Sequence, residues 1–335
     1  MSDPNQGFQA PPPPTFETEP ERQRPAYLLY AGIALVVLGI IFMVLSIVGG
    51  VLMVVGTVGT GASVCALGIL LAAFSFIRMP VVPDPPPPMS TAGTLTGIFF
   101  EPTSVFRNLR AHPKFLAAII IAGLLNGIYV LAFVHRVTPE RIINFTVDKL
   151  EESPIKPPPE ALAKMRTEGV EQQKAITQQI GNVLKAVVGH FFGVAFLAAL
   201  CLLGVLAFGG RMHYWQTYAV VAYVALPVTI IQKVISFIVL YLKSPEDIHP
   251  LLGQESLVYD NLGYLIAAKD HPILFVMATA IGVLSFYRLW LSAVGLREGG
   301  YKVTSSQAWG VAITLFVIFL LFGMAIAAIF PGFLG

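Results

Sequence analysis

The fold class is decided by one uncharged apolar run, which reads YLLYAGIALVVLGIIFMVLSIVGGVLMVVGTVGTGASVCALGILLAAFSFI at residues 27–77. A helix that crosses a bilayer needs about 20 apolar residues, each adding about 1.5 Å. The 51 residues of this run are too many for one span, and they fit two helices joined by a tight turn within residues 49–60. The sequence therefore predicts an N-terminal transmembrane hairpin over residues 27–78.

The composition places the whole chain among membrane proteins. Charged residues make up 12% and apolar residues 56% of the 335 residues, whereas about 25% of the residues of a soluble protein are charged. The net charge of +2 is too small to indicate nucleic-acid binding. Cys65 and Cys201 lie inside apolar runs, so we expect small buried side chains rather than a disulfide or a metal pair.

Apolar stretches predict five further spans beyond the hairpin. They cover residues 115–134, 183–208, 218–242, 273–294 and 308–330. We therefore expect an all-α polytopic bundle of about seven spans, with a five-helix membrane domain over residues 95–335. Residues 1–26 are polar, lack the features of a cleaved signal peptide, and are expected to be disordered. A proline-rich linker at residues 79–94 separates the hairpin from the membrane domain.

Polar segments join the predicted spans. Residues 136–182 form the largest polar loop, in which one helix begins near Pro139 and a second near Glu160. No helix breaker follows Glu160 before Gly181, so the second helix is expected to run into the next span. Residues 243–271 form another polar loop, acidic on balance.

Residues 95–114 are amphipathic and include Pro102, which suits the first turn of a short helix. Such a helix is expected to lie in the headgroup plane of the membrane with its basic side chains toward anionic lipid. The candidate lipid-interface residues are Phe106, Arg107, Arg110 and Lys114. The alternative is an ordinary polar connector.

Basic residues favour a cytoplasmic N-terminus. The two sides of the predicted topology carry equal numbers of basic residues, but seven of those on one side lie in the single long loop at 136–182. Because short loops and residues near span ends decide orientation, the side with the N-terminal tail is predicted to be cytoplasmic. The C-terminus then lies outside, and we expect a multi-pass protein of a bacterial cytoplasmic membrane.

Polar side chains at membrane depth are the main candidates for function. Lys233 and Arg288 lie inside predicted spans, where a basic side chain costs roughly 2.5–3.5 kcal/mol. Both lie past the middle of their spans, so the expectation is that their long stems carry the charge to an interface. No Asp or Glu lies inside any predicted span, so neither has an evident ion-pair partner. Asn126 and Gln232 are the other polar candidates at this depth.

The sequence contains no pattern typical of a catalytic site or a cofactor site. His190 and His213 belong to no metal-ligand pattern, and no nucleophile motif is present. We therefore expect no metal, no cofactor and no enzymatic activity. Gly189 and Gly193 have the spacing that permits close helix packing, which we expect to occur within this chain rather than in a dimer interface.

Three short segments together resemble the Yip family of Ypt/Rab-interacting membrane proteins, in its bacterial form. The first is IFFEPTSVF at residues 98–106, followed by Leu109 and Pro113. The second is the pair Gly209-Gly210, then YWQ at 214–216 and YAVVAY at 218–223, ending with Pro227. The third is YRLWLSAVGL at 287–296, followed by Val303, Ser305 and Ala308.

The resemblance covers residues 95–330, leaves out the hairpin and linker, and implies five spans. Eukaryotic members are implicated in vesicle traffic and interact with small GTPases and with one another. They carry an Asp-Leu-Tyr-Gly-Pro type motif in the cytoplasmic tail, which residues 1–26 and 79–114 lack. The resemblance therefore does not extend GTPase binding to this chain.

Two functions remain as alternatives at the level of sequence. The first is a non-enzymatic membrane scaffold or adaptor, whose partners are the lipid bilayer and other membrane proteins or further copies of itself. The second is a small transporter or channel that uses Lys233, Arg288, Asn126 and Gln232 at membrane depth.

Overall fold

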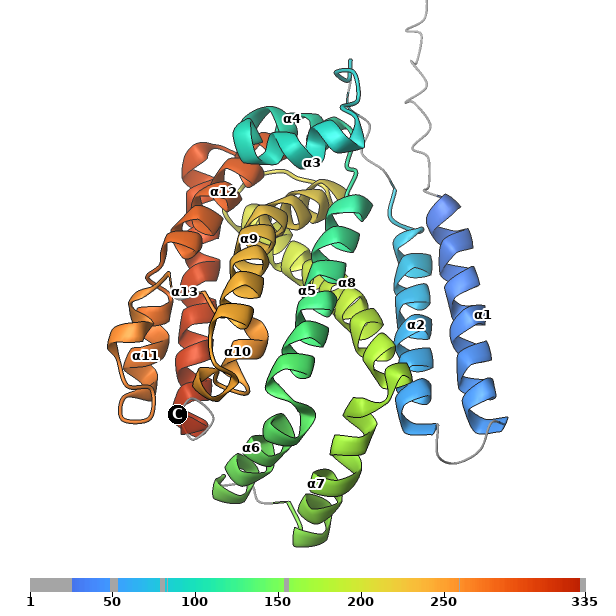
Figure 1. Ribbon diagram of the computed structural model, residues 1–335. Coiled ribbons are helices and arrows are strands. Elements are labelled where there is room, and N and C mark those ends of the chain that lie inside the picture. The colour runs from blue at the N-terminus through green and yellow to red at the C-terminus, as the bar shows by residue number, and fades with distance from the viewer. Residues whose placement is uncertain are drawn as a thin grey trace, which may run out of the picture.

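The protein is a bundle of helices, as the sequence predicts (Figure 1). The computed structural model describes residues 26–48, 54–78, 82, 84–153, 157–258 and 260–331. Four helices in these ranges are long and apolar enough to cross a membrane: α5 (Leu116–Val137), α8 (Ile176–Ala207), α9 (Tyr214–Leu242) and α13 (Ser305–Ile329). They correspond to four of the five spans predicted after the hairpin.

Helices α1 (Ala26–Val48) and α2 (Val54–Phe74) form the predicted hairpin beside α8 (Figure 1). The turn between them, and the tail before Ala26, lie outside the described residues. Glycines allow the two backbones to touch: a Cβ at Gly32 would lie 2.6 Å from the backbone nitrogen of Ala72, and one at Gly39 would lie 2.7 Å from that of Cys65. The hairpin is therefore held by backbone packing as well as by apolar burial.

Two short helices, α3 (Thr91–Phe100) and α4 (Pro102–Ala111), lie across one end of the bundle (Figure 1). Ser90 caps α3 and Pro102 opens α4, so helical structure begins inside the segment predicted to be linker. The side chain of Asn108 donates to the carbonyl of Pro87 at 2.9 Å and ties the proline-rich segment to α4.

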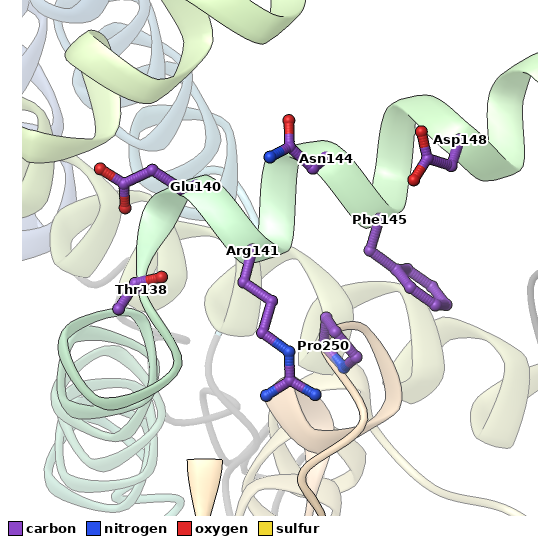
Figure 2. Close-up of a pocket in the computed structure, with 7 residues that line it drawn as sticks. All are labelled: Thr138, Glu140, Arg141, Asn144, Phe145, Asp148 and Pro250. Carbon is purple, nitrogen blue, oxygen red and sulfur yellow. The ribbon is translucent and has the colours of Figure 1, made fainter. Parts of the chain in front are cut away.

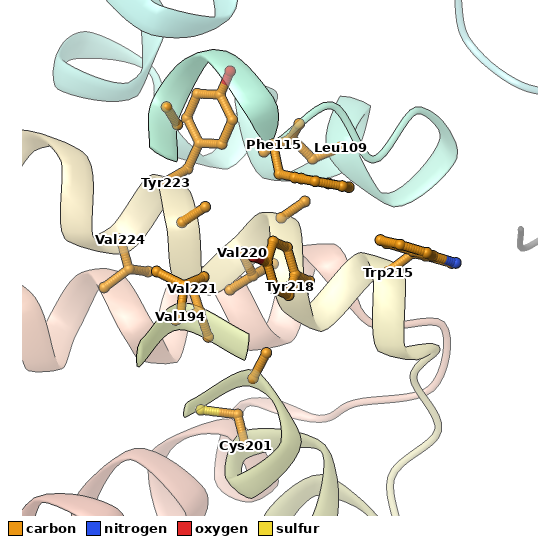
Figure 3. Packing of buried hydrophobic residues seen from close by; sticks show 14 of the residues in the cluster. Leu109, Phe115, Val194, Cys201, Trp215, Tyr218, Val220, Val221, Tyr223 and Val224 are labelled. Atoms are coloured by element: carbon orange, nitrogen blue, oxygen red, sulfur yellow. The ribbon is translucent and has the colours of Figure 1, made fainter. Parts of the chain in front are cut away.

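The core lies where α9 meets α4, α5, α8 and α12 (Val283–Gly299). Phe115 stacks on Trp215 with ring centres 5.3 Å apart and meets the edge of Tyr218 at 4.7 Å (Figure 3). Phe74 of the hairpin joins this aromatic cluster, and the carbonyl of Ile77 accepts a 3.0 Å hydrogen bond from the Trp215 indole. Half of the apolar 18-residue stretch of α9 is buried inside the protein, whereas only 11% of the corresponding stretch of α13 is buried. Helix α9 is therefore central in the bundle and α13 is peripheral.

The polar loop at 136–182 contains two helices, α6 (Pro139–Glu152) and α7 (Pro159–Lys174), which project from the other end of the bundle (Figure 1). The predicted continuation of the second helix through to Gly181 is wrong. Ala175 has an extended backbone, which ends α7, and α8 then begins at Ile176 and passes through Gly181. The break lets α7 turn back against α6.

The predicted span at 273–294 is not a single helix. It consists of α11 (Pro272–Thr279) and α12, separated at residues 280–282. Backbone pairing with the preceding loop causes the break: Asn261 and Gly282 form a β-bridge, and the carboxylate of Asp260 accepts from Leu284 N at 2.7 Å. The loop thus supplies hydrogen bonds that a continuous helix would have made internally. The remaining short helices of the loop are η2 (Pro245–Asp247), α10 (Leu252–Glu255) and η3 (Leu262–Leu265).

Candidate functional site

The loop after α9 folds back against the helices that precede it. The Tyr129 hydroxyl of α5 donates to the carbonyl of Gly253 at 2.6 Å, and Ser236 Oγ of α9 accepts from Leu257 N at 3.0 Å. A Cβ at Gly253 would lie 2.8 Å from the ring of Phe133, so only glycine fits there without displacing that ring. Residues 248–257 therefore form a packed plug between α5 and α9, which we call the loop plug.

Lys233 of α9 contacts the loop plug. Its ammonium group donates to the backbone carbonyl of Glu255 and lies 4.4 Å from the centre of the Tyr129 ring. The residue is only 4% exposed and precedes the end of α9 by nine residues, which is about 13 Å along the helix. The loop brings a carbonyl and α5 brings a ring to the ammonium group, which take the place of water. That the stem of Lys233 carries its charge to a membrane interface stays a prediction.

The other polar candidates at membrane depth lie apart from this contact. Asn126 and Gln232 are half-buried on α5 and α9. Arg288 is exposed on α12. Glu255, whose backbone carbonyl accepts from Lys233, comes from a loop that the sequence predicts to lie outside the membrane. The sequence therefore gives no sign that Glu255 lies near Lys233. A functional role of these residues remains a prediction.

A shallow hollow of about 560 Å³ lies on α6, lined by Thr138, Glu140, Arg141, Asn144, Phe145, Asp148 and Pro250. Arg141 and Phe145 point from α6 toward Pro250, whereas Asn144 and Asp148 point away from it (Figure 2). The Arg141 guanidinium donates to the carbonyls of Pro245 and Glu246. The hollow therefore lies between α6 and the loop that follows α9.

His249 connects this hollow to the loop plug. Its ring meets that of Phe145 at 5.0 Å, and its Nδ1 accepts from the backbone N–H groups of Leu251 and Leu252. Because Nδ1 accepts, the neutral ring carries its proton on Nε2, which is buried with no partner among the described residues. Burial lowers the pKa of His249, and the charges of Lys149 and Arg141 lower it further.

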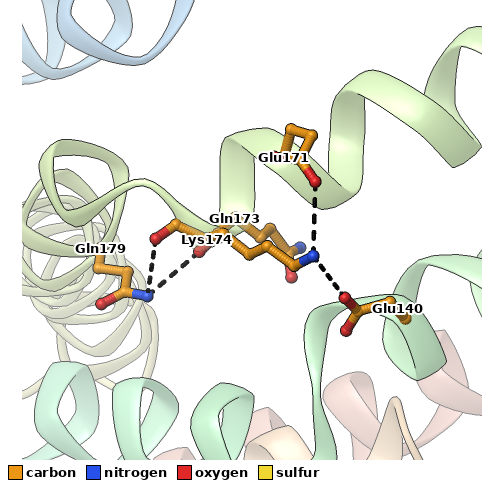
Figure 4. A network of polar contacts seen from close by, with 5 residues as sticks. All are labelled: Glu140, Glu171, Gln173, Lys174 and Gln179. Atoms are coloured by element: carbon orange, nitrogen blue, oxygen red, sulfur yellow. Dashed lines mark hydrogen bonds and ion pairs between the residues drawn. The ribbon is translucent and has the colours of Figure 1, made fainter.

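Ion pairs fix α6 against α7. Lys174 of α7 lies 2.7 Å from the Glu140 carboxylate and also pairs with Glu171 (Figure 4). Arg166 contacts Asp148 at 2.6 Å and Glu151 at 3.0 Å. The hydrogen bond from Lys174 lowers the pKa of Glu140, and the same bond raises the pKa of Lys174. We call this pair of helices, α6 (Pro139–Glu152) and α7 (Pro159–Lys174), the polar arm.

The predicted lipid-interface residues divide into two groups. Phe106 is completely buried, and its ring lies 3.1 Å from the position that a Cβ at Gly295 would occupy. The expectation that Phe106 faces lipid is therefore wrong. The apolar face of α4 packs on α12 and α9 instead. Arg107 pairs with Glu298 at 3.0 Å with its side chain 59% exposed, and Lys114 is also exposed. Arg110 is half-buried. Contact of these three side chains with lipid remains a prediction.

Gly189 and Gly193 mediate no helix contact within the part of the chain that the structure describes. A Cβ at either position would have no neighbour within 4 Å, and both residues are exposed. The expectation of close packing within the chain is therefore wrong for this pair. The described residues also include no group of three or more His, Cys, Asp or Glu side chains that could hold a metal ion.

The three segments that carry the family resemblance meet at one end of the bundle. Val220 packs where Cβ atoms at Gly295 and Gly299 would lie, and Gln216 donates to the carbonyl of Arg110 at 2.8 Å. Arg211 forms a β-bridge with Lys302. Gly209 has a φ of 78°, which favours glycine. The three segments therefore pack against one another through close contacts at glycines and through backbone hydrogen bonds.

The family model of the Yip1 domain matches residues 96–327. The chain belongs to the Yip1 domain family. Comparison with curated proteins and with solved structures found no match. The family assignment, together with the long apolar helices, shows a multi-pass membrane protein. The Yip1 domain begins within α3 and ends within α13, so the hairpin of α1 and α2 precedes it.

Proposed function

We propose that this Yip1-domain protein is a non-enzymatic membrane scaffold or adaptor whose polar arm docks onto a second membrane protein. The observation that carries the proposal is the construction of the arm. Two helices that are too polar to lie in hydrocarbon are held together outside the bundle by ion pairs that run from one helix to the other. An ordered surface of this kind loses little conformational entropy when a partner binds, which favours recognition.

The hollow on α6 supplies the docking surface of this proposal. Its lining combines an aromatic ring, an amide and two carboxylates from Phe145, Asn144, Glu140 and Asp148. Asn144 is exposed and makes no side-chain hydrogen bond among the described residues, so it is available to a partner. We expect the partner to be a membrane protein with a polar helix or loop outside the bilayer, and a second copy of this chain is included.

The test is recovery of a defined complex from detergent or nanodiscs. Full-length protein with a photo-crosslinker at position 144 should form an adduct with one membrane partner. Asn144→Trp fills the hollow without breaking an ion pair and should weaken that complex by about tenfold, or about 1.4 kcal/mol. Gln172→Trp, an exposed amide on α7, is the matched control. Recovery of no stable membrane partner, or equal weakening by both variants, would argue against the proposal.

Arg288 favours a transporter or channel as the second candidate function, because this basic residue lies within an apolar stretch that the sequence predicts to cross the membrane. Flux measured in proteoliposomes distinguishes the two functions. If flux occurs and both Lys233→Ala and Arg288→Ala abolish it, the scaffold proposal fails.

A further inference from the structure

A β-bridge holds Arg211 and Lys302 side by side. Arg211 lies in the turn between α8 and α9, and Lys302 lies in the turn between α12 and α13. The two residues exchange backbone hydrogen bonds, from Arg211 N to Lys302 O at 2.9 Å and from Lys302 N to Arg211 O at 3.2 Å. Residues paired in this way have α-carbons about 5.5 Å apart and direct their side chains to the same side. Both side chains are exposed, so the backbone places two cations next to each other at the surface.

Further contacts fix the two turns against each other. The side chain of Gln307 donates to the carbonyl of Phe208 at 2.8 Å, and Gln307 also forms the capping box of α13 with Thr304. A Cβ at Gly210 would lie 3.3 Å from the carbonyl oxygen of Lys302, so the glycine allows the close approach of the two backbones. The backbone beneath the two cations is therefore preorganised, and little of its conformational freedom is lost when a ligand binds them.

The two cations are not neutralised by an acidic side chain. Within the part of the chain that the structure describes, neither Arg211 nor Lys302 takes part in an ion pair or a side-chain hydrogen bond. The nearest carboxylate in the sequence is that of Glu298, which already pairs with Arg107 at 3.0 Å and with Arg297 at 2.7 Å. Like charges directly opposite each other destabilise a bridge. A bound anion between the two side chains would remove this repulsion.

The bridge lies at the level of lipid headgroups. Helix α8 ends at Ala207 and α13 begins at Ser305, and both helices are long and apolar enough to cross a membrane. Arg211 follows the end of α8 by four residues, and Lys302 precedes the start of α13 by three. Charged residues this close to the ends of two spans lie just outside the hydrocarbon, where phosphate groups are found.

Exposed aromatic side chains accompany the bridge. Phe208, Tyr301 and Trp309 are 44%, 54% and 38% exposed. The Phe208 ring lies 2.6 Å from the position that a Cβ at Gly310 would occupy, so it rests on the first turns of α13. Aromatic residues concentrate at the boundary between headgroups and hydrocarbon. Beyond them α13 exposes apolar side chains such as Ile313, which the acyl chains of a lipid can cover.

We propose that Arg211 and Lys302 bind the phosphate of an anionic phospholipid headgroup. The planar guanidinium of Arg211 matches two phosphate oxygens, and the ammonium group of Lys302 reaches a third. Two adjacent cations favour a headgroup with a net negative charge over one that also carries an amine. The site goes beyond the scaffold proposal, because neither the polar arm nor the hollow on α6 takes part in it.

The experiment measures lipid binding to the full-length protein in detergent by native mass spectrometry. The protein is titrated with phosphatidylglycerol and, separately, with phosphatidylcholine. The first phosphatidylglycerol should bind at least about fivefold more tightly, because one cation beside an anionic headgroup already supplies about that factor. Equal affinity for the two lipids overturns the proposal. Displacement of phosphatidylglycerol by an equal concentration of inorganic phosphate also overturns it, because the site would then take a free anion rather than a headgroup.

Variants decide whether the selectivity belongs to the bridge. Lys302→Glu places opposite charges across it, which should raise the thermal unfolding midpoint by about 1–3 °C without lipid and abolish the preference for phosphatidylglycerol. Binding would then be lost from a protein that is folded and more stable. Lys302→Gln keeps the backbone bridge, should weaken phosphatidylglycerol binding by about fivefold, and serves if Lys302→Glu does not fold.

The matched controls are Lys269→Glu and Lys269→Gln, which make the same charge changes at an exposed lysine before α11. Both should leave the preference for phosphatidylglycerol unchanged. If the variants at Lys302 keep the preference, or if those at Lys269 lose it equally, the proposal is overturned.

Discussion

The ammonium group of Lys233 lies 4.4 Å from the centre of the Tyr129 ring, and the two residues hold neighbouring carbonyls of one loop, those of Glu255 and Gly253. Helices α5 and α9, which flank the loop plug, thus each contribute one hydrogen-bond donor to it. The arrangement explains how a charged side chain is kept within the bundle: backbone carbonyls and an aromatic face replace the water that a lysine would otherwise need.

Tyr129→Phe should loosen the loop plug. The substitution keeps the ring beside Lys233 but removes the 2.6 Å hydrogen bond to the carbonyl of Gly253. The carbonyl is then buried without a partner, which costs about 1–3 kcal/mol. Hydrogen exchange in nanodiscs should show faster exchange at residues 248–257 and an unchanged rate in α13. Unchanged protection of the loop plug would show that the hydroxyl does not hold it.

Acidification should open the same loop through His249. Burial, helped by Lys149 and Arg141, lowers the pKa of His249 in the folded loop below its ordinary value of 6.5. The opened loop therefore binds a proton more tightly, so this stability is complete above about pH 6.5 and is lost as the pH falls below it. Exchange at residues 248–257, corrected for the intrinsic rate, should rise between pH 7.5 and 5.5.

His249→Asn is the control for that effect. An Asn oxygen occupies the place of Nδ1 and can still accept from Leu251 N and Leu252 N. It has no proton to gain in this range. The variant should keep the loop plug closed at pH 7.5 and show a smaller change on acidification. An equally large change in the variant would assign the pH effect to another group.

Gly295→Ala should destabilise the end of the bundle where the family segments meet. The added methyl would lie 2.7 Å from Val220 Cγ1 and 3.1 Å from the Phe106 ring. Overpacking of this kind costs about 1–3 kcal/mol, which thermal unfolding in detergent would register. Gly169→Ala is the comparison, since its Cβ would lie 3.4 Å from Ile143, and a helical alanine there should stabilise by about 1 kcal/mol. The same sign for both variants would contradict this assignment.

Lys174→Gln should loosen the polar arm. The hydrogen bond from Lys174 holds the pKa of Glu140 below its ordinary value of 4.5. The linked stability is therefore present above about pH 4.5 and is lost as the pH falls through the lowered pKa. In the unaltered protein, protection of α6 against hydrogen exchange should fall on acidification below pH 4.5, whereas in Lys174→Gln it should be lower at pH 7 and depend less on pH. Lys164→Gln, which breaks an ion pair within α7 alone, should leave α6 unchanged.

Several features of the fold follow from local sequence. Long uncharged stretches predict α5, α8, α9 and α13, because helices satisfy their own backbone hydrogen bonds in hydrocarbon. Pro139 marks the start of α6, where its missing N–H is not needed. Periodicity also identifies the amphipathic α4. Its apolar face, however, could cover protein or lipid equally well, and only the packing of Phe106 on Gly295 decides between them.

The candidate site was only partly predictable. Charge in an apolar run singles out Lys233 and Arg288, but their neighbours come from segments distant in the chain. From the sequence alone, Tyr129 is one more apolar residue of a predicted span, and Glu255 belongs to a predicted polar loop. The apolar residues Ile248 and Leu257, both buried, were the available signal that this loop returns to the bundle. His249 gave no signal, because a capping role depends on backbone geometry.

By itself the sequence determined that this chain is a helical membrane protein of the Yip family, because burying apolar surface away from water is a property of composition and spacing. Only the tertiary structure determined which groups surround the charged side chains of the predicted spans. It broke one predicted span by pairing residues 261 and 282, folded a polar loop against Lys233, and left Arg288 exposed on α12. These outcomes depend on contacts between residues far apart in the chain, whose energies no local pattern contains.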